Sequence, residues 1–133
     1  MSLLSVTRLS VSIHTFAILK DITLDIAAGE IVAITGESGS GKSMTALAAM
    51  GLLPQGAAVT GSIELDGREL TALSESALCS LRGNDIGMVF QEPMTALNPV
   101  KTIGVQVAET ILIHGAAPRA EAMRIAADTL TRV

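Results

Sequence analysis

Alternation of apolar and polar positions marks two parts of this chain as strands with one buried face. Residues 22–26 and 63–65 place Ile or Leu at every second position, with polar residues between them. A period of two is the pattern of a half-buried strand. Asp66-Gly67 follows the second run directly and favours a tight hairpin turn. Residues 1–30 and 59–70 therefore predict an antiparallel β portion.

Two further runs are continuously apolar instead of alternating. Residues 31–35 read Ile-Val-Ala-Ile-Thr after Gly29-Glu30, and residues 86–90 read Ile-Gly-Met-Val-Phe. Short runs of this kind are typical of strands that are buried on both faces, as in parallel sheets. We expect both runs to be such strands, in a core whose pairing is mainly parallel.

The stretches between these runs have helical spacing. Residues 44–50 are rich in Ala, Leu and Met, which are good helix formers, and Gly51 and Pro54 end the run. A short amphipathic helix is predicted before residue 86. Its apolar positions are Leu73, Ala77, Leu78 and Leu81.

From residue 95 onward the pattern is helical. Ile103, Val107 and Ile111 recur at intervals of four. Gly115 is expected to close this helix, and Pro118 to lie in the first turn of the next one. The apolar positions that continue the period are Met123, Ala127 and Leu130.

Composition and charge limit the function classes. The chain has 133 residues, of which 49% are hydrophobic and 2% aromatic, so it suits one domain with an aliphatic core. Its formal charge of −4 and the lack of a long basic run argue against nucleic-acid binding. Cys79 is the single cysteine, which excludes an intrachain disulfide and fits a reducing compartment. No segment approaches the roughly 18–20 apolar residues that span a bilayer. A membrane would therefore be reached through a partner.

One motif carries most of the chemical information. It reads G-x-x-x-x-G-K-S and consists of Gly36, Glu37, Ser38, Gly39, Ser40, Gly41, Lys42 and Ser43. Its glycines can adopt backbone angles that let consecutive N–H groups point at one anion. Lys42 adds a mobile positive charge for the outer phosphates, and the Ser43 hydroxyl can coordinate Mg²⁺. With a predicted strand before it and a predicted helix after it, the motif indicates a phosphate-binding loop (P-loop).

A second cluster narrows the choice among P-loop proteins. Residues 89–99 read Val-Phe-Gln-Glu-Pro-Met-Thr-Ala-Leu-Asn-Pro, with Gln91 at the end of a predicted strand. This cluster resembles the Q-loop of ABC-transporter ATP-binding subunits. The extended sequence pattern F-Q-E-P-M-T-x-L-N-P is similar to that of the family branch that serves peptide, oligopeptide and nickel importers. The resemblance covers nearly the whole chain.

The resemblance implies an α/β fold: a P-loop NTPase core with an antiparallel β portion and the start of a helical insert. It implies a partial nucleotide-binding domain, the N-terminal half, with the P-loop core and β portion in residues 1–94 and the start of the helical subdomain in 95–133. ATP and Mg²⁺ are the implied cofactors. The backbone of residues 38–43 would cradle the phosphates, with the N–H of Met44 beside them. Lys42 would bridge the outer two phosphates, and Gln91 would reach the Mg²⁺ and the attacking water.

The implied function is ATP hydrolysis that powers the import of peptides or similar small solutes. The implied partners are transmembrane permease subunits, a second ATPase subunit and, indirectly, a solute-binding protein. The subunit would lie peripherally on the cytoplasmic face of the cell membrane.

The chain departs from the family pattern in several places. Ile13 stands where an aromatic residue usually stacks on adenine, and Met44 stands where threonine is common. The L-S-G-G-Q signature, the catalytic Glu that ends a second apolar strand and the switch His are missing. We therefore expect the 133-residue piece to bind nucleotide poorly and to hydrolyse almost none.

Three other readings stay open on the residues alone. They are a small P-loop kinase, a non-transport ABC ATPase of DNA repair or translation, and a truncated nucleotide-binding module without turnover. The solute is open as well, because its selection resides in the membrane and solute-binding partners.

Overall fold

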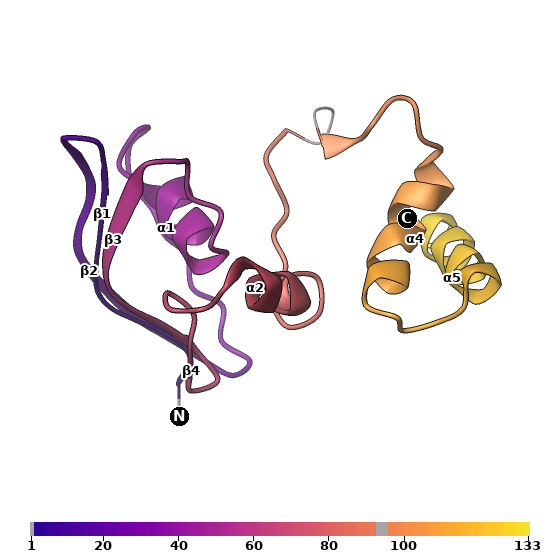
Figure 1. Ribbon diagram of the computed structural model, residues 1–133, viewed down its shortest axis with the longest axis horizontal. Coiled ribbons are helices and arrows are strands. Elements are labelled where there is room, and N and C mark those ends of the chain that lie inside the picture. Colours follow the sequence, from indigo (N-terminus) through magenta and orange to yellow (C-terminus); the bar gives the residue numbers. More distant parts are fainter. Residues whose placement is uncertain (1, 93–95) are drawn as a thin grey trace. The chain divides into compact units, whose positions relative to one another are not determined.

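The computed structural model describes residues 2–92 and 96–133. The chain divides into two compact units, Met1–Cys79 and Ser80–Val133 (Figure 1). The predicted division after residue 94 lies within residues 93–95, outside the described residues, and it stays a prediction.

The first unit is built on an antiparallel sheet whose strand order is β2-β1-β3-β4. Its strands are β1 (Ser2–Ile13), β2 (Phe16–Ala27), β3 (Ala57–Leu65) and β4 (Arg68–Glu69). Both β segments predicted from alternation are therefore confirmed. The turn between β3 and β4 is Asp66-Gly67, as predicted, and both residues have positive φ, 49° and 75°.

Aliphatic side chains of the strands form the core of this unit. The most deeply buried are Val6, Leu9, Val11, Leu19 and Ile63, each at most 3% exposed. A local irregularity curves the sheet, since the pairing of β1 with β3 shifts register between Thr7 and Ser10. Gly61 is required there, because a Cβ on it would lie 2.4 Å from the carbonyl oxygen of Arg8. The long strands bend together along their length (Figure 1).

Helix α1 (Lys42–Ala49) packs against β2 and confirms the helix predicted at residues 44–50. It buries Thr45 and Ala48. Gly51, with φ 64°, ends it as predicted: its N–H donates to the carbonyl of Ala48 and the next N–H donates to that of Leu47. This pair of bonds is the Schellman arrangement, which satisfies the last carbonyls of the helix.

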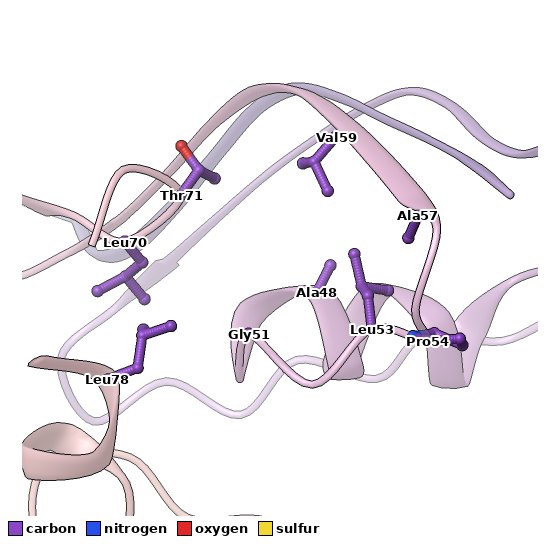
Figure 2. A pocket seen from close by; sticks show the side chains of 9 residues that line it. All are labelled: Ala48, Gly51, Leu53, Pro54, Ala57, Val59, Leu70, Thr71 and Leu78. Atoms are coloured by element: carbon purple, nitrogen blue, oxygen red, sulfur yellow. The ribbon is translucent and has the colours of Figure 1, made fainter. Parts of the chain in front are cut away.

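A cavity of about 240 Å³ lies between the end of α1 and β3. Figure 2 shows its lining, which is almost entirely apolar. The lining residues are Ala48, Gly51, Leu53, Pro54, Ala57, Val59, Leu70, Thr71 and Leu78. Leu78 belongs to α2 (Glu75–Leu81), the predicted short amphipathic helix. The cavity shows that α1 and the sheet pack incompletely at this point.

The second unit contains a helical hairpin of α4 (Ile103–Ile113) and α5 (Arg119–Thr131). Small side chains form its centre: Ala108, Ala122 and Ala126 are at most 1% exposed, with Val107, Ile111, Leu112 and Met123 around them. Gly115 follows α4 with φ 64°, as predicted. Both helices of the predicted C-terminal region are therefore confirmed.

Two details of the helix predicted after Pro118 are wrong. Pro118 is the N-cap, with φ −61° and ψ 156°, so the helix begins one residue later at Arg119. Ala127 is exposed and Leu130 is 41% exposed, whereas Ala122 and Ala126 are buried. The part of α5 that packs against α4 is centred on Ala122 and Ala126, whose small side chains allow the two helices to approach closely.

The two continuously apolar runs do not form the predicted strands. Residues 31–35 and 87–90 have no strand structure, and Ile86 makes only an isolated bridge with Arg82. Ile31 is 96% and Val89 97% exposed. A strand of this kind needs a neighbouring strand to pair with and helices that cover both faces of the sheet. Within the described part of the chain, the strands of the sheet pair only with one another, so neither run has such a neighbour.

No helix in the described part of the chain combines the length and the apolar character that crossing a membrane requires.

Candidate functional site

The predicted P-loop is an exposed bend between the apolar run at residues 31–35 and the start of α1. Residues 36–40 are exposed, and Gly41 and Lys42 are half-buried. Gly39 and Gly41 have φ of 82° and 95°, in the left-handed region that favours glycine. The N–H of Ser40 donates to the carbonyl of Glu37 over 3.2 Å, which closes a turn inside the loop. The glycine pattern of the motif therefore corresponds to backbone geometry that the loop uses.

The ammonium group of Lys42 lies against the loop that precedes it. Its Nζ donates to the carbonyl oxygen of Gly36 over 2.8 Å and to that of Glu37 over 2.6 Å. The hydroxyl oxygen of Ser40 is 3.4 Å away. The loop thus holds a positive charge among exposed residues, and an arriving phosphate oxygen can replace a carbonyl as its partner.

The N-terminus of α1 offers its backbone N–H groups at the same place. Gly41 is the N-cap, no side chain caps the helix, and no acidic residue lies in the first turn. The carbonyl of Gly41 accepts from the N–H of Thr45 over 2.9 Å and from its hydroxyl over 3.1 Å. Uncapped N–H groups and the helix dipole favour an anion here. An acidic residue in the first turn would compete with that anion for the same N–H groups.

Few side chains near this loop can hold a metal ion. Ser43 is exposed in the first turn of α1, and Met44 behind it is half-buried. Residues 2–92 and 96–133 contain no group of three or more His, Cys, Asp or Glu side chains placed to bind a metal. This donor set does not make an all-protein cage, but it fits Mg²⁺, which is commonly held by one or two protein ligands together with substrate phosphates.

Gln91 lies in the second unit and is exposed beside Phe90, which is 50% exposed. Pro93, Met94 and Thr95 of the same cluster lie outside the described residues. The role predicted for Gln91 toward Mg²⁺ and water stays a prediction.

The end of this cluster is held by a residue that the sequence reasoning missed. The side-chain amide of Gln106 in α4 accepts from the N–H of Asn98 over 2.7 Å and donates to its carbonyl over 3.0 Å. It also donates to the carbonyl of Lys101 over 3.0 Å. Gln106 interrupts the otherwise apolar run of residues 103–108. A polar residue within an apolar run was the available signal.

The residues considered for the adenine lie at one end of the sheet. Ile13 and Phe16 are cross-strand partners next to the β1–β2 turn, and His14 in that turn has φ 53°. Ile13 is half-buried, whereas Phe16 is 72% exposed. His14 packs on Gly56, where a Cβ would lie 3.4 Å from its Cε1. That Ile13 occupies the position where the family usually has the adenine-stacking aromatic residue stays a prediction.

Comparison with known proteins identifies the family. The family model described as ABC transporter matches residues 19–132. A peptidoglycan transport ATP-binding protein, YejF of Agrobacterium fabrum, is 46% identical over 98% of this chain and 25% of its own length. The oligopeptide transport ATP-binding protein OppD of Mycobacterium tuberculosis is 48% identical over 84% of this chain and 19% of its own length. The oligopeptide transport ATP-binding protein AppD of Bacillus subtilis is 46% identical over 84% of this chain and 35% of its own length.

The chain thus spans between about a fifth and about a third of the length of these relatives, 19% to 35%. The resemblance to the peptide branch is confirmed by them, and the α/β P-loop fold class is confirmed by the family match. Since the family model covers residues 19–132 and includes the whole P-loop, the chain belongs to the ABC transporter family.

Proposed function

We propose that this chain binds ATP with Mg²⁺ through residues 36–44 and forms part of an ATP-hydrolysing subunit that energises the import of peptides or similar small solutes. The observation that carries the proposal is the exposed loop, which holds Lys42 against its own carbonyls and leads into an uncapped helix N-terminus. The relatives support the solute class, because they are named as oligopeptide and peptidoglycan transport ATP-binding proteins.

Different groups of the loop would bind different parts of Mg·ATP. Backbone N–H groups of residues 38–44 would donate to the phosphate oxygens, and Lys42 would exchange its carbonyl partners for the outer two phosphates. Ser43 would supply a ligand to Mg²⁺, which neutralises charge on the phosphates when it is bound. Gln91 would orient the attacking water. Such catalysis is positioning plus electrostatic stabilisation.

Assembly would follow from the same proposal. The proposed partners are transmembrane permease subunits and a second ATPase subunit, identical or related, with a solute-binding protein acting indirectly and no nucleic acid. Association with the permease would place the subunit peripherally on the cytoplasmic face of the membrane. The signature segment, the catalytic Glu and the switch His are not found among these residues, so the chain by itself would show almost no turnover.

A calorimetric titration with Mg·ATP tests the proposal directly. We expect weak but measurable binding by the 133-residue chain and none by Lys42→Ala. Lys101→Ala is the matched control, because it removes the same charge from a lysine that pairs with Glu109 in the second unit. Equal binding by the parent chain and Lys42→Ala would contradict the proposal.

A further inference from the structure

The P-loop has a neighbour in the antiparallel sheet. A Cβ placed on Gly41 would lie 2.5 Å from Cδ2 of Leu19 and 3.5 Å from the carbonyl oxygen of Ile18. Carbon atoms pack best at about 3.5–4.0 Å, so the Leu19 side chain fills the space directly beside the Gly41 Cα. A residue of β2 therefore abuts the backbone at the point where the loop becomes α1.

Leu19 is well placed to hold that position. Its side chain is 3% exposed, and it lies opposite Val11, which is 1% exposed, in the pairing of β2 with β1. Packing within β2 and against the neighbouring strand β1 therefore restricts the Leu19 side chain. The loop residues before Gly41 are exposed and have little packing of their own.

Gly41 is thus held on two sides. Thr45 binds its carbonyl oxygen through both the N–H and the hydroxyl, at 2.9 and 3.1 Å. Leu19 packs against its Cα. The φ of Gly41, 95°, sets the direction of the N–H groups that open α1. Fixing this one residue therefore fixes the aim of the amides that would face a phosphate.

We infer that Leu19 is a positioning residue for phosphate binding: it preorganises the P-loop by packing under Gly41 and has no contact with the nucleotide itself. The inference rests on the proposed ATP binding. It means that the antiparallel sheet, through Leu19 of β2, fixes the backbone conformation of the P-loop at Gly41. Motif reasoning does not find it, since Leu19 lies outside the motif.

The test compares two leucine-to-valine changes, each of which places a β-branched residue at a strand position. Leu19→Val removes the Cδ atoms that touch Gly41. Leu9→Val is the matched control, because Leu9 is 0% exposed and lies in β1 opposite Ile22. Affinity for Mg·ATP is measured by calorimetry, the thermal midpoint by circular dichroism, and the Gly41 and Lys42 amide signals by ¹H–¹⁵N spectra. Leu19→Met, which restores the length of the side chain, is the rescue variant.

We expect Leu19→Val to raise the Kd for Mg·ATP by roughly fivefold to tenfold, because a loop that must order on binding loses affinity. The Gly41 and Lys42 amide signals should shift in the same variant before ATP is added. Leu9→Val should keep the parent affinity and amide signals even if its thermal midpoint falls as far, and Leu19→Met should recover binding.

Two results would overturn the inference. One is a parent-like Kd in Leu19→Val, and the other is an equal loss of affinity in Leu9→Val. A parent chain that binds no more Mg·ATP than Lys42→Ala would overturn the proposed function together with this inference. The two failures are therefore distinguishable.

Discussion

The amide of Gln106 binds Asn98 at both backbone groups, accepting from its N–H over 2.7 Å and donating to its carbonyl over 3.0 Å. Asn98 in turn accepts the N–H of Val100 on its own side-chain oxygen over 3.0 Å. One helix residue thus organises the loop at the end of the cluster of residues 89–99. The consequence is that this loop is ordered by α4, without a strand beside it.

Gln106→Ala should loosen this loop while α4 stays folded. We expect a loss of about 1–2 kcal/mol in stability of the second unit, since each net hydrogen bond contributes roughly 1 kcal/mol. Amide hydrogen exchange at Asn98 and Val100 should become faster. Gln55→Ala, a change at an exposed glutamine of the first unit, is the control. Unchanged exchange in Gln106→Ala would show that the loop is held by other contacts.

Glu69 should make the stability of the first unit depend on acid pH. Burial raises the pKa of the Glu69 carboxyl. Hydrogen bonds from Ser62, Thr71 and the N–H of Ile63 together lower it by more than burial raises it, so that the pKa falls from 4.5 to about 2. The folded state therefore favours the ionised form. Its contribution is full above about pH 4.5 and is lost as the pH falls toward 2.

The change Glu69→Gln tests this dependence. We expect it to lower the free energy of unfolding by about 1–2 kcal/mol at neutral pH, because the charged acceptor is lost. The difference from the parent chain should shrink between pH 4.5 and 2, as measured by urea unfolding. Asp25→Asn, at an exposed position in β2, is the control. A difference that stays constant with pH would contradict the assigned cause.

The two left-handed glycines of the P-loop should differ in their tolerance of alanine. A Cβ on Gly39 meets nothing within 4 Å, so Gly39→Ala should cost only backbone strain, roughly 1–2 kcal/mol. Gly41→Ala adds the overlap with Leu19, and overpacking costs about 1–3 kcal/mol more. Thermal unfolding of both variants measures the difference. Equal midpoints would mean that Leu19 moves aside freely.

Filling the cavity of Figure 2 should stabilise the first unit. Ala57 lines it in β3, and Ala57→Val adds two methyl groups there along with a better strand former. Cavity-filling changes commonly add about 0.5–2 kcal/mol. Ala58→Val, at the next and exposed position of the same strand, gives the gain from strand preference alone. A gain no larger in Ala57→Val than in this control would contradict the packing argument.

Replacing Ile31 should show whether the first apolar run is exposed, as the structure has it. Ile31 is 96% exposed, so Ile31→Asp should change the free energy of unfolding by no more than about 0.5 kcal/mol. Ile63→Asp, at a position that is 0% exposed, should unfold the unit. Both are followed by circular dichroism during urea unfolding. A large loss in Ile31→Asp would mean that the run is buried as a strand in solution.

Much of the fold followed from local patterns, because the forces behind them act over a few residues. Asp66-Gly67 forms the predicted turn because both residues tolerate positive φ. Gly51 and Gly115 end their helices for the same reason. The spacing of the P-loop glycines predicts a backbone that can surround an anion, and the loop has that geometry at Gly39 and Gly41.

The continuously apolar runs show where this kind of reasoning ends. The apolar composition of residues 31–35 and 86–90 indicates that these segments suit a buried strand, but it does not indicate which strands would lie beside them. Whether an apolar residue is buried depends on the segments that pack against it. In the described part of the chain those neighbours are absent, so Ile31 and Val89 stay exposed despite a correct reading of their apolar character.

The sequence by itself determined the chemistry of the loop, the half-buried strands and the helices, because each depends on residue type and short-range spacing. Only the tertiary structure decided that Leu19 packs beneath Gly41 and that Gln106 binds Asn98. Both contacts join segments whose local patterns are independent of each other. Such contacts arise when the chain folds back on itself, and spacing along the sequence does not encode which two residues then meet.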